Sequence, residues 1–326
     1  IYLWRPVWHP RLLWSPPIFR YYFRFGSKNF AAQLLQKGLN EIDDLWAGFF
    51  LGNTPLGFYS RAYVSSTYPR QIIATPINQV AAGTYAELKG QRKRLSQAFF
   101  RSNAVLVRSG FFLGGLFFLV APEFIRIVLT AKWMPMLNTF RLMLVFTLLD
   151  PMKQTIADLF VAVGEPERVV KVRLVQLAVL VAGLFALGFP LGIEGVALAM
   201  DVMLAIGIAL LLRYARDHVD FSARQLFVAP TAALALALIA GFPISSLHGL
   251  GESDWVAGAV KAAVFSGVYA LVLFLLERDQ LLQMLALIWH LSPLERRLPL
   301  SRFGRRFDTQ ERPQECRQAA PGEEVL

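Results

Sequence analysis

Residues 166–216 read PERVVKVRLVQLAVLVAGLFALGFPLGIEGVALAMDVMLAIGIALLLRYAR, and this stretch decides the fold class. Its two apolar runs, Val169–Phe189 and Ile193–Leu212, are each about 20 residues long, the length that a helix needs to cross roughly 30 Å of hydrocarbon. Basic residues flank the pair on the outside, and the short connection between the runs has none. The pattern predicts two membrane-spanning helices whose outer ends lie on the same side of the membrane.

The same pattern recurs along the 326-residue chain, which is 55% hydrophobic and has a mean hydropathy of +0.45. No alternating period-2 pattern suggests a membrane barrel, so the spans are expected to be helices. We therefore predict an all-α polytopic membrane protein. Its eight expected spans are Gly26–Gly52, Leu56–Ala82, Phe99–Ala121, Met136–Val163, Val169–Phe189, Ile193–Leu212, Leu226–Pro243 and Trp255–Leu276.

The charges between the spans give an orientation. In the loops, 24 basic residues fall on one side, and only Arg126 and Lys132 fall on the other. The positive-inside rule predicts that both termini of this chain are cytoplasmic and that the membrane is the bacterial inner (plasma) membrane. The net charge of +10 belongs to this topology signal. A nucleic-acid partner is not expected, because no soluble domain is present to carry a basic face.

The two ends of the chain differ from its centre. The chain opens on Ile1, and residues 1–25 resemble a connection, so we predict a cytoplasmic linker and expect that an N-terminal part is missing. Residues 26–276 form the predicted transmembrane lobe. Residues 277–291 contain DQLLQMLALIWHL, which predicts an amphipathic juxtamembrane helix. Residues 292–326 are rich in Pro, Arg, Gln and Glu and are predicted to be a disordered basic tail.

Charged side chains inside the spans are the main functional clue. Each costs about 2.5–3.5 kcal/mol near mid-membrane, so twelve facing lipid would cost on the order of 30 kcal/mol. Their spacing is helical: Lys37, Glu41 and Asp44 share one face of the first span, and Asp150 and Asp158 share one face of the fourth. The twelve are Lys37, Glu41, Asp43, Asp44, Arg61, Arg70, Arg108, Arg141, Asp150, Lys153, Asp158 and Asp201.

Two interpretations of these charges stay open. They form interhelical ion pairs and helix-end residues, or they line a hydrated cavity for an anionic substrate. On the second interpretation, the cationic cavity residues are Lys37, Arg61, Arg70 and Lys153, and the candidates for ion coupling are Asp43, Asp44, Asp150 and Asp158. Pro69 and Pro76 mark either a broken helix that exposes polar backbone or a static kink in the second span.

Signals of an enzyme are absent from the sequence. The four histidines (His9, His218, His248 and His290) are scattered, and Cys316 is the single cysteine. No Gly-rich phosphate loop, P-loop or serine elbow occurs. We therefore expect no catalytic residues, no cofactor and no metal.

Asn40–Tyr63, with the sequence NEIDDLWAGFFLGNTPLGFYSRAY, resembles the polysaccharide transporter branch of the multidrug/oligosaccharidyl-lipid/polysaccharide (MOP) flippase superfamily. Members carry an Asp in this span, a Gly-rich exit and an entry to the next helix like that of Leu56–Tyr63. Pro69–Gly90 (PRQIIATPINQVAAGTYAELKG) and the segment around Lys132–Trp133 look like the next landmarks of the family.

The resemblance implies fourteen helices in two lobes, six plus eight, of which this chain looks like the second. It implies export of undecaprenyl-diphosphate-linked oligosaccharides in the synthesis of O-antigen (lipopolysaccharide), capsule or exopolysaccharide, coupled to a cation gradient. The implied partners are the lipid-linked oligosaccharide, membrane lipids, the polysaccharide polymerase and export machinery, and the missing N-terminal lobe.

Three alternatives remain. A multidrug or cation antiporter of the same superfamily is one, although a site for cationic drugs is expected to be acidic. A second is a non-transporting membrane scaffold of a polysaccharide synthesis complex, in which the charges only pair helices and tolerate reversal. The third is a membrane-embedded glycan enzyme, which needs a large periplasmic loop that this chain does not offer.

Overall fold

The computed structural model describes residues 15–243 and 254–291, and side chains within these ranges except at positions 18, 21, 25, 69, 70, 72, 73 and 279–291. The described chain is helical, with no strand. Most of the predicted linker, residues 1–14, and the predicted basic tail, residues 292–326, lie outside the described residues. The expectation of an all-α polytopic protein is confirmed.

Eight long helices make up most of the described chain, and each predicted span falls on one of them in chain order. They are α1 (Pro16–Phe50), α2 (Asn53–Leu88), α3 (Arg92–Phe124), α4 (Leu137–Val163), α5 (Pro166–Gly183), α7 (Ile193–Ala215), α8 (Ala223–Gly241) and α9 (Asp254–Leu291). Between them lie the π-helices η1 (Ile125–Leu129) and η3 (Leu184–Gly188), the 3-10 helix η2 (Ala131–Met136) and the short α6 (Phe189–Leu191).

Local sequence signals set several of the helix ends. A proline occupies the first turn of α1 and of α5, where a missing backbone N–H costs nothing. Gly52, between α1 and α2, has φ 93°, and Gly164, between α4 and α5, has φ 90°. Side chains disfavour this left-handed region, so these two glycines allow the tight reversals.

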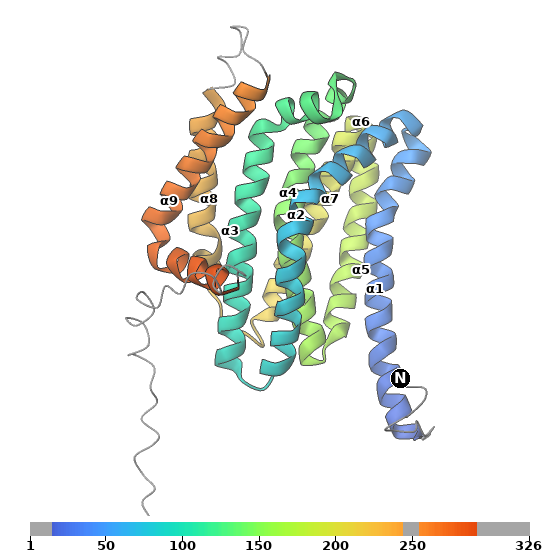
Figure 1. Ribbon diagram of the computed structural model, residues 1–326. Coiled ribbons are helices and arrows are strands. Elements are labelled where there is room, and N and C mark those ends of the chain that lie inside the picture. Colours follow the sequence, from blue (N-terminus) through green and yellow to red (C-terminus); the bar gives the residue numbers. More distant parts are fainter. Residues whose placement is uncertain (1–14, 244–253, 292–326) are drawn as a thin grey trace, which may run out of the picture. The chain divides into compact units, whose positions relative to one another are not determined.

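Two elements differ in detail from the prediction. α1 begins at Pro16, so its first turns extend into the segment predicted to be a linker. α2 is a single helix through Pro69 and Pro76, and it bends along its length (Figure 1). A proline removes one helical hydrogen bond and its ring displaces the preceding turn, which bends a helix without necessarily ending it.

The chain divides into two units, Ile1–Leu276 and Glu277–Leu326. In the first unit, α4 lies at the centre and packs against α2, α3 and α7, while α5 packs between α7 and α1 (Figure 1). The first part of α9 packs on α3, where Phe112 contacts the rings of Phe265 and Tyr269. The second unit contains the end of α9, which continues as a helix beyond non-helical backbone angles at Glu277.

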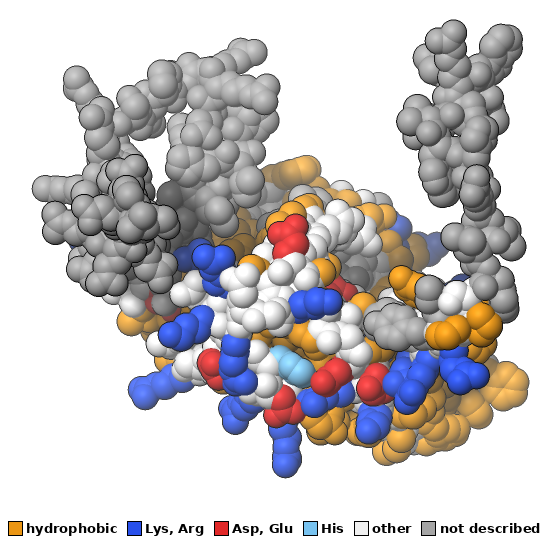
Figure 2. Space-filling model, turned by 90° about the horizontal axis from the view of Figure 1, so that it is seen from below, with side chains coloured by type: hydrophobic (Ala, Val, Ile, Leu, Met, Phe, Trp, Pro, Cys, Tyr) orange, Lys and Arg blue, Asp and Glu red, His pale blue; other side chains and the backbone are white. Residues whose placement is uncertain are grey.

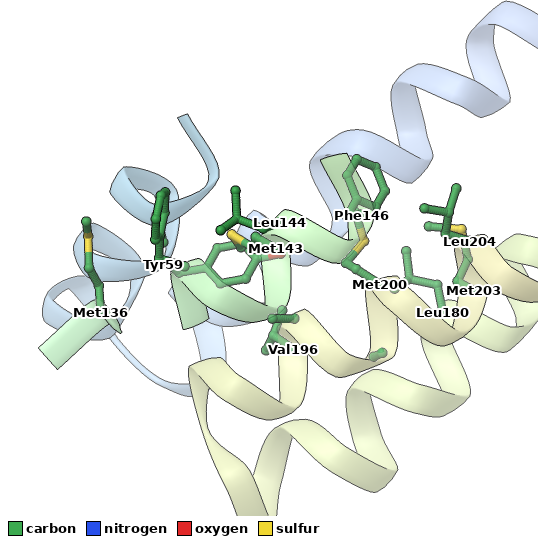
Figure 3. Close-up of a cluster of buried hydrophobic side chains, with 14 of the residues drawn as sticks. Tyr59, Met136, Met143, Leu144, Phe146, Leu180, Val196, Met200, Met203 and Leu204 are labelled. Carbon is green, nitrogen blue, oxygen red and sulfur yellow. The ribbon is translucent and has the colours of Figure 1, made fainter. Parts of the chain in front are cut away.

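The core of the first unit lies between α2, α4, α5 and α7. Figure 3 shows Tyr59 of α2, Met143 and Phe146 of α4, and Met200 of α7 gathered in one cluster of buried side chains. In a bilayer, lipid tails are as apolar as these residues, so close packing rather than removal from water holds the helices together. The methionines suit this seam because they fill irregular gaps.

Small residues bring α3 and α4 into close contact. A Cβ atom at Gly110 would lie 3.0 Å from the backbone oxygen of Leu148, and one at Gly114 would overlap the Leu148 side chain. The spacing of these two glycines is the small-xxx-small pattern that lets membrane helices approach closely. The position of α4 at the centre of the unit therefore depends on them.

Five helical segments are long and apolar enough to cross a membrane on length and composition: Arg92–Leu129, Pro166–Leu191, Ile193–Ala215, Ala223–Gly241 and Asp254–Arg278. The remaining long helices of the described chain are α1, α2 and α4. These three helices carry ten of the twelve charged residues that the sequence places inside the spans. A transmembrane role for them therefore requires that their polar faces avoid lipid.

Candidate functional site

An outward-facing polar stripe runs along α2. Its exposed residues are spaced by one or two helical turns: Arg61, Tyr68, Gln71, Thr75 and Gln79. On α8 and α9, by contrast, the large exposed side chains are apolar, for example Leu236, Ile239, Leu271 and Leu275. Apolar side chains suit contact with lipid tails, whereas guanidinium and amide groups need water or a polar partner. The α2 stripe is therefore a surface of a different kind.

α1 also exposes polar groups. Lys37 and Glu41 are exposed one turn apart, and the amide of Gln36 donates a hydrogen bond to Asn40 over 2.8 Å. α1 exposes apolar Leu34 and Leu45 as well, so its outward side is mixed. Lys37 has no hydrogen bond or ion pair within the described part of the chain, and its ammonium group is available to another molecule.

Asp43 and Asp44 face α2 near the turn that connects the two helices. The hydroxyl of Tyr59 donates to Asp43 over 2.5 Å, and the hydroxyl of Ser60 donates to Asp44 over 2.9 Å. Asp43 and Tyr59 are fully buried, whereas Asp44 is half-buried. These carboxyl groups therefore hold α1 against α2, and Asp44 retains some access from outside.

Arg61 sits at the end of the α2 stripe, against a turn of unusual backbone geometry. Its guanidinium carbon lies 5.7 Å from the centre of the Trp133 ring, which also contacts Phe58 edge-to-face at 5.7 Å. The turn begins at Thr130, whose φ of 78° and ψ of 160° lie in a region that costs a non-glycine residue about 1–3 kcal/mol. The Thr130 carbonyl accepts the Trp133 N–H over 3.1 Å. Trp133 is thus held in place beside an exposed arginine.

Lys153 and Asp150 form an ion pair one turn apart on α4. Their Nζ and Oδ1 atoms lie 2.6 Å apart, and the side chains are 5% and 16% exposed. Pro151 interrupts the α4 ladder between them, and its carbonyl accepts hydrogen bonds from Asn78 of α2 and from Thr155. A proline, a charge pair and a polar contact to α2 therefore coincide at mid-α4.

Asp158 lies on α4 two turns after Asp150, within range of the charge of Arg173 on α5. It accepts a hydrogen bond from Gln154 over 2.9 Å and is half-buried. The charge of Arg173 on α5 acts on both Asp158 and Asp150, and Arg173 itself donates to the backbone carbonyl of Ala32 on α1. Arg173 is one of the 24 basic residues that the charge pattern assigns to the loops and ends of one side, but its side chain is buried between helices. The α5 helix begins at Pro166, which moves Arg173 into its second turn.

The predicted cationic residues do not form a single cluster. Arg61 lies beside Trp133, Lys153 is neutralised by Asp150, and Lys37 is exposed on α1. The side chain of Arg70 lies outside the described residues. Among the described side chains, no group of three or more His, Cys, Asp or Glu residues is placed to hold a metal ion.

A second buried ion pair was not predicted from the sequence. Lys261 of α9 and Glu123 of α3 lie 2.6 Å apart, and each side chain is 2% exposed. Neither is among the twelve charges singled out, because Glu123 follows the third span and the eighth span is treated as apolar. A second ion pair, Arg126 of η1 with Asp254 at the start of α9, lies nearby in sequence on both sides, with 3.0 Å between Nη1 and Oδ1.

The chain is similar to known proteins in sequence and in fold. Residues 1–138 match the family model of polysaccharide biosynthesis proteins. Over 139 residues the chain is 27% identical to the teichuronic acid biosynthesis protein TuaB of Bacillus subtilis (strain 168), a match covering 42% of this chain and 29% of TuaB. The lipid II flippase MurJ in an inward closed conformation superimposes with a TM-score of 0.67 at 13% identity, covering 83% of this chain and 57% of MurJ. The chain thus spans less than two thirds of either protein, and its fold is similar to that of MurJ.

Proposed function

We propose that this chain, a flippase-like membrane protein of the polysaccharide biosynthesis family over residues 1–138, forms one lobe of an exporter of lipid-linked oligosaccharide. The substrate class is an oligosaccharide on undecaprenyl diphosphate, and a cation gradient drives its movement to the outer leaflet. TuaB is a teichuronic acid biosynthesis protein and MurJ is a lipid II flippase, and each is consistent with a polymer precursor carried on a lipid.

The exposed polar stripe of α2 carries this proposal. An Arg facing lipid costs about 2.5–3.5 kcal/mol at mid-membrane and less toward the helix end where Arg61 lies, and the two exposed glutamines further along the stripe add the cost of unpaired amides. A water-filled cavity between this lobe and a second lobe removes that cost. The stripe then becomes the lobe's contribution to the cavity wall, with hydroxyl and amide groups suited to sugar hydroxyls.

The diphosphate of the substrate needs cations within that cavity. Arg61 can donate two N–H groups from the edge of its guanidinium to phosphate oxygens while the flat face of the guanidinium stays against Trp133. Lys37 offers a flexible ammonium group from α1. Arg70, one helical turn beyond Ser66 on α2, is proposed to act with them.

Lys153 offers a link between substrate and coupling ion. In its present arrangement it is neutralised by Asp150. A diphosphate that draws Lys153 away removes the nearest cation from Asp150 in a poorly hydrated site, and a proton or Na⁺ becomes more favourable there. Asp158, Asp43 and Asp44 are the further candidates for this coupling role.

The orientation and the partners follow from the same proposal. The Lys/Arg-rich ends face the cytoplasm, so both termini of this chain lie there. A second, N-terminal lobe completes the cavity, because alternating access needs two bodies that rock against each other. The polymerase and export machinery take up the exported precursor. The chain is proposed to act without a cofactor and without catalysing a chemical reaction.

The test is export of surface polysaccharide by cells that carry variants of the encoded protein. Losing a charge-assisted contact to phosphate costs about 1.5–3 kcal/mol, so Arg61→Ala is expected to lower export about 10–100-fold. Arg61→Lys should retain part of it. Lys132→Ala is the matched control, since Lys132 is an exposed cation near Trp133 but off the stripe. Membrane levels of each variant are measured by immunoblot.

The outcomes separate the alternatives. Full export in both Arg61→Ala and Lys37→Ala contradicts the cationic cavity and favours a scaffold. Loss of resistance to cationic drugs, with polysaccharide export intact, favours a multidrug antiporter. Loss of export together with loss of the protein from the membrane indicates a folding defect. The Arg61→Lys variant then tests the cavity, because it keeps the positive charge and should retain part of the export.

A further inference from the structure

A separate pocket of about 460 Å³ lies at the Lys/Arg-rich end of the first unit, between the start of α3 and the start of α8. Two aromatic rings, Phe100 and Phe221, form its apolar wall, and Gln97, Arg101 and Gln225 supply polar groups. None of its lining residues lies on α1, α2 or α4. The pocket therefore belongs to neither the α2 stripe nor the charge pairs discussed above.

Hydrogen bonds and ring contacts fix the walls of this pocket. Arg92 holds the carboxylate of Asp220 with two hydrogen bonds of 3.0 and 2.8 Å, and the hydroxyl of Ser96 accepts the Asp220 backbone N–H over 2.9 Å. The ring of Phe221 is packed against Phe99, with 5.4 Å between centroids. The α7–α8 loop is thereby tied to α3, and the pocket is a built feature of the surface.

The electrostatics of the pocket favour an anion. Arg92 donates hydrogen bonds to Asp220 and lowers its pKa, so this carboxylate stays ionised. Its negative charge is balanced by the positive charge of Arg92. Arg101 is the remaining charge on the lining, and it has no ion pair within the described part of the chain. The 19-residue helix α8 follows its N-cap Ser222 and has no acidic residue in its first turn, so its positive dipole end adds to the effect.

The level of the pocket along the helices points to a lipid. It lies where the third and seventh predicted spans begin, which is the depth of lipid headgroups. Lys and Arg side chains gather on this end of the molecule (Figure 2). Basic groups at this depth attract anionic lipids, each contributing about 1 kcal/mol. A suitable ligand has a phosphate for the cation, hydroxyls for the two amides and an apolar part for the two aromatic rings.

We propose that this pocket binds the headgroup of one anionic phospholipid, with the guanidinium of Arg101 on its phosphate. Gln97 and Gln225 hydrogen-bond the headgroup hydroxyls, and Phe100 and Phe221 contact the glycerol and the first methylenes of the acyl chains. The bound lipid fills the space between α3 and α8 and holds their ends together. This site is independent of transport and stands even where the proposed function fails.

The experiment measures lipid retention by the full chain. The protein is purified from nanodiscs containing phosphatidylglycerol and phosphatidylcholine in equal parts, and native mass spectrometry counts the phosphatidylglycerol molecules that stay bound. One tightly retained molecule is expected. Arg101→Gln should weaken its retention about tenfold, since it removes a charge-assisted contact to phosphate.

Arg94→Gln is the matched control, because Arg94 is an exposed arginine at the same end that does not line the pocket. Equal loss in Arg94→Gln and Arg101→Gln would show diffuse attraction by the whole basic face and would overturn the proposal. Retention of phosphatidylcholine equal to that of phosphatidylglycerol would do the same. Displacement by soluble glycerol phosphate would assign the site to a free phosphate ester instead of a lipid.

Discussion

Two buried ion pairs of equal length, 2.6 Å, occupy different settings in this molecule. Lys261 and Glu123 join two helices, α9 and α3, and both side chains are 2% exposed. Asp150 and Lys153 lie on one helix, α4, and Asp150 is 16% exposed beside a proline that interrupts the helical ladder. The two pairs therefore differ in how easily their charges can separate. The first pair separates only if α9 moves away from α3, whereas the second can separate by rotation of its side chains.

This difference indicates different roles. A fully buried pair that bridges helices fixes their relative position, because either charge left alone is costly. A pair within one helix adds little to the fold, and in a partly open setting either partner can accept a new one. We therefore propose that the pair Glu123–Lys261 is structural and that the pair Asp150–Lys153 is the one that takes part in the proposed transport. The predictions below test that division.

The largest expected effect is on folding. Lys261→Met removes the ammonium group 2.6 Å from buried Glu123 and is expected to lower stability by about 3–5 kcal/mol, as for other broken buried pairs. The measurement is thermal unfolding of the purified chain in detergent. Lys171→Met, at an exposed lysine of α5, is the control and should leave the unfolding midpoint unchanged. A Lys261→Met variant as stable as the parent would remove the structural role of this pair.

Charge reversal separates the two pairs directly. Glu123→Lys combined with Lys261→Glu keeps an ion pair between α3 and α9 and should retain most of the polysaccharide export. Asp150→Lys combined with Lys153→Asp keeps an ion pair on α4 but places the cation elsewhere, and export should fall about 10–100-fold at unchanged membrane level. Equal export from both swapped variants would favour the scaffold interpretation, in which all of these charges only pair helices.

A smaller effect is expected at the α1–α2 turn. Tyr59→Phe removes the hydroxyl that donates to buried Asp43, and an unsatisfied buried group of this kind costs about 1–3 kcal/mol. Thermal unfolding again gives the value, and Tyr63→Phe, on the next turn of α2, serves as the comparison. Should Asp43 also bind the coupling ion, Tyr59→Phe will shift the dependence of export on that ion, which a purely structural hydroxyl would not do.

The smallest effect concerns the exposed ion pairs of the α7–α8 loop. Arg168 lowers the pKa of Asp217, and Arg92 lowers the pKa of Asp220, each mainly through a hydrogen bond to the carboxylate. A lowered pKa means that the stabilisation is present above the ordinary value of 3.8 and is lost as the pH falls through the lowered one. Unfolding midpoints measured across this acidic range should fall in the parent chain. The Asp217→Asn, Asp220→Asn double variant should show a shallower decline.

The sequence predicted the fold class for a physical reason. A segment of membrane length must satisfy its backbone internally, so apolar runs separated by short charged loops leave helices as the expected outcome. Asn40–Tyr63, which carries the resemblance to the polysaccharide transporter family, lies within residues 1–138, the part that matches the family model of polysaccharide biosynthesis proteins. Helical spacing also predicted which helices have polar faces: α1, α2 and α4 fall outside the five helices that are apolar enough to span on composition alone.

The sequence left the pairing of those polar groups open. Lys37 and Lys153 look alike in the chain, but one is exposed on α1 and the other is buried beside Asp150. Arg173 counts as a loop cation by its position, but it donates to the α1 backbone. Partner choice depends on the rotation of each helix about its axis, which no periodicity within a single helix specifies.

By itself, therefore, the sequence determined the helical class, the order of the spans and the helices that carry charge, since these follow from length, apolar content and period. Only the tertiary structure decided that Glu123 meets Lys261, that Trp133 lies over Arg61 and that a pocket forms between α3 and α8. Each of these joins residues distant in the chain, and close packing of helices at small residues such as Gly110 and Gly114 sets which side chains meet.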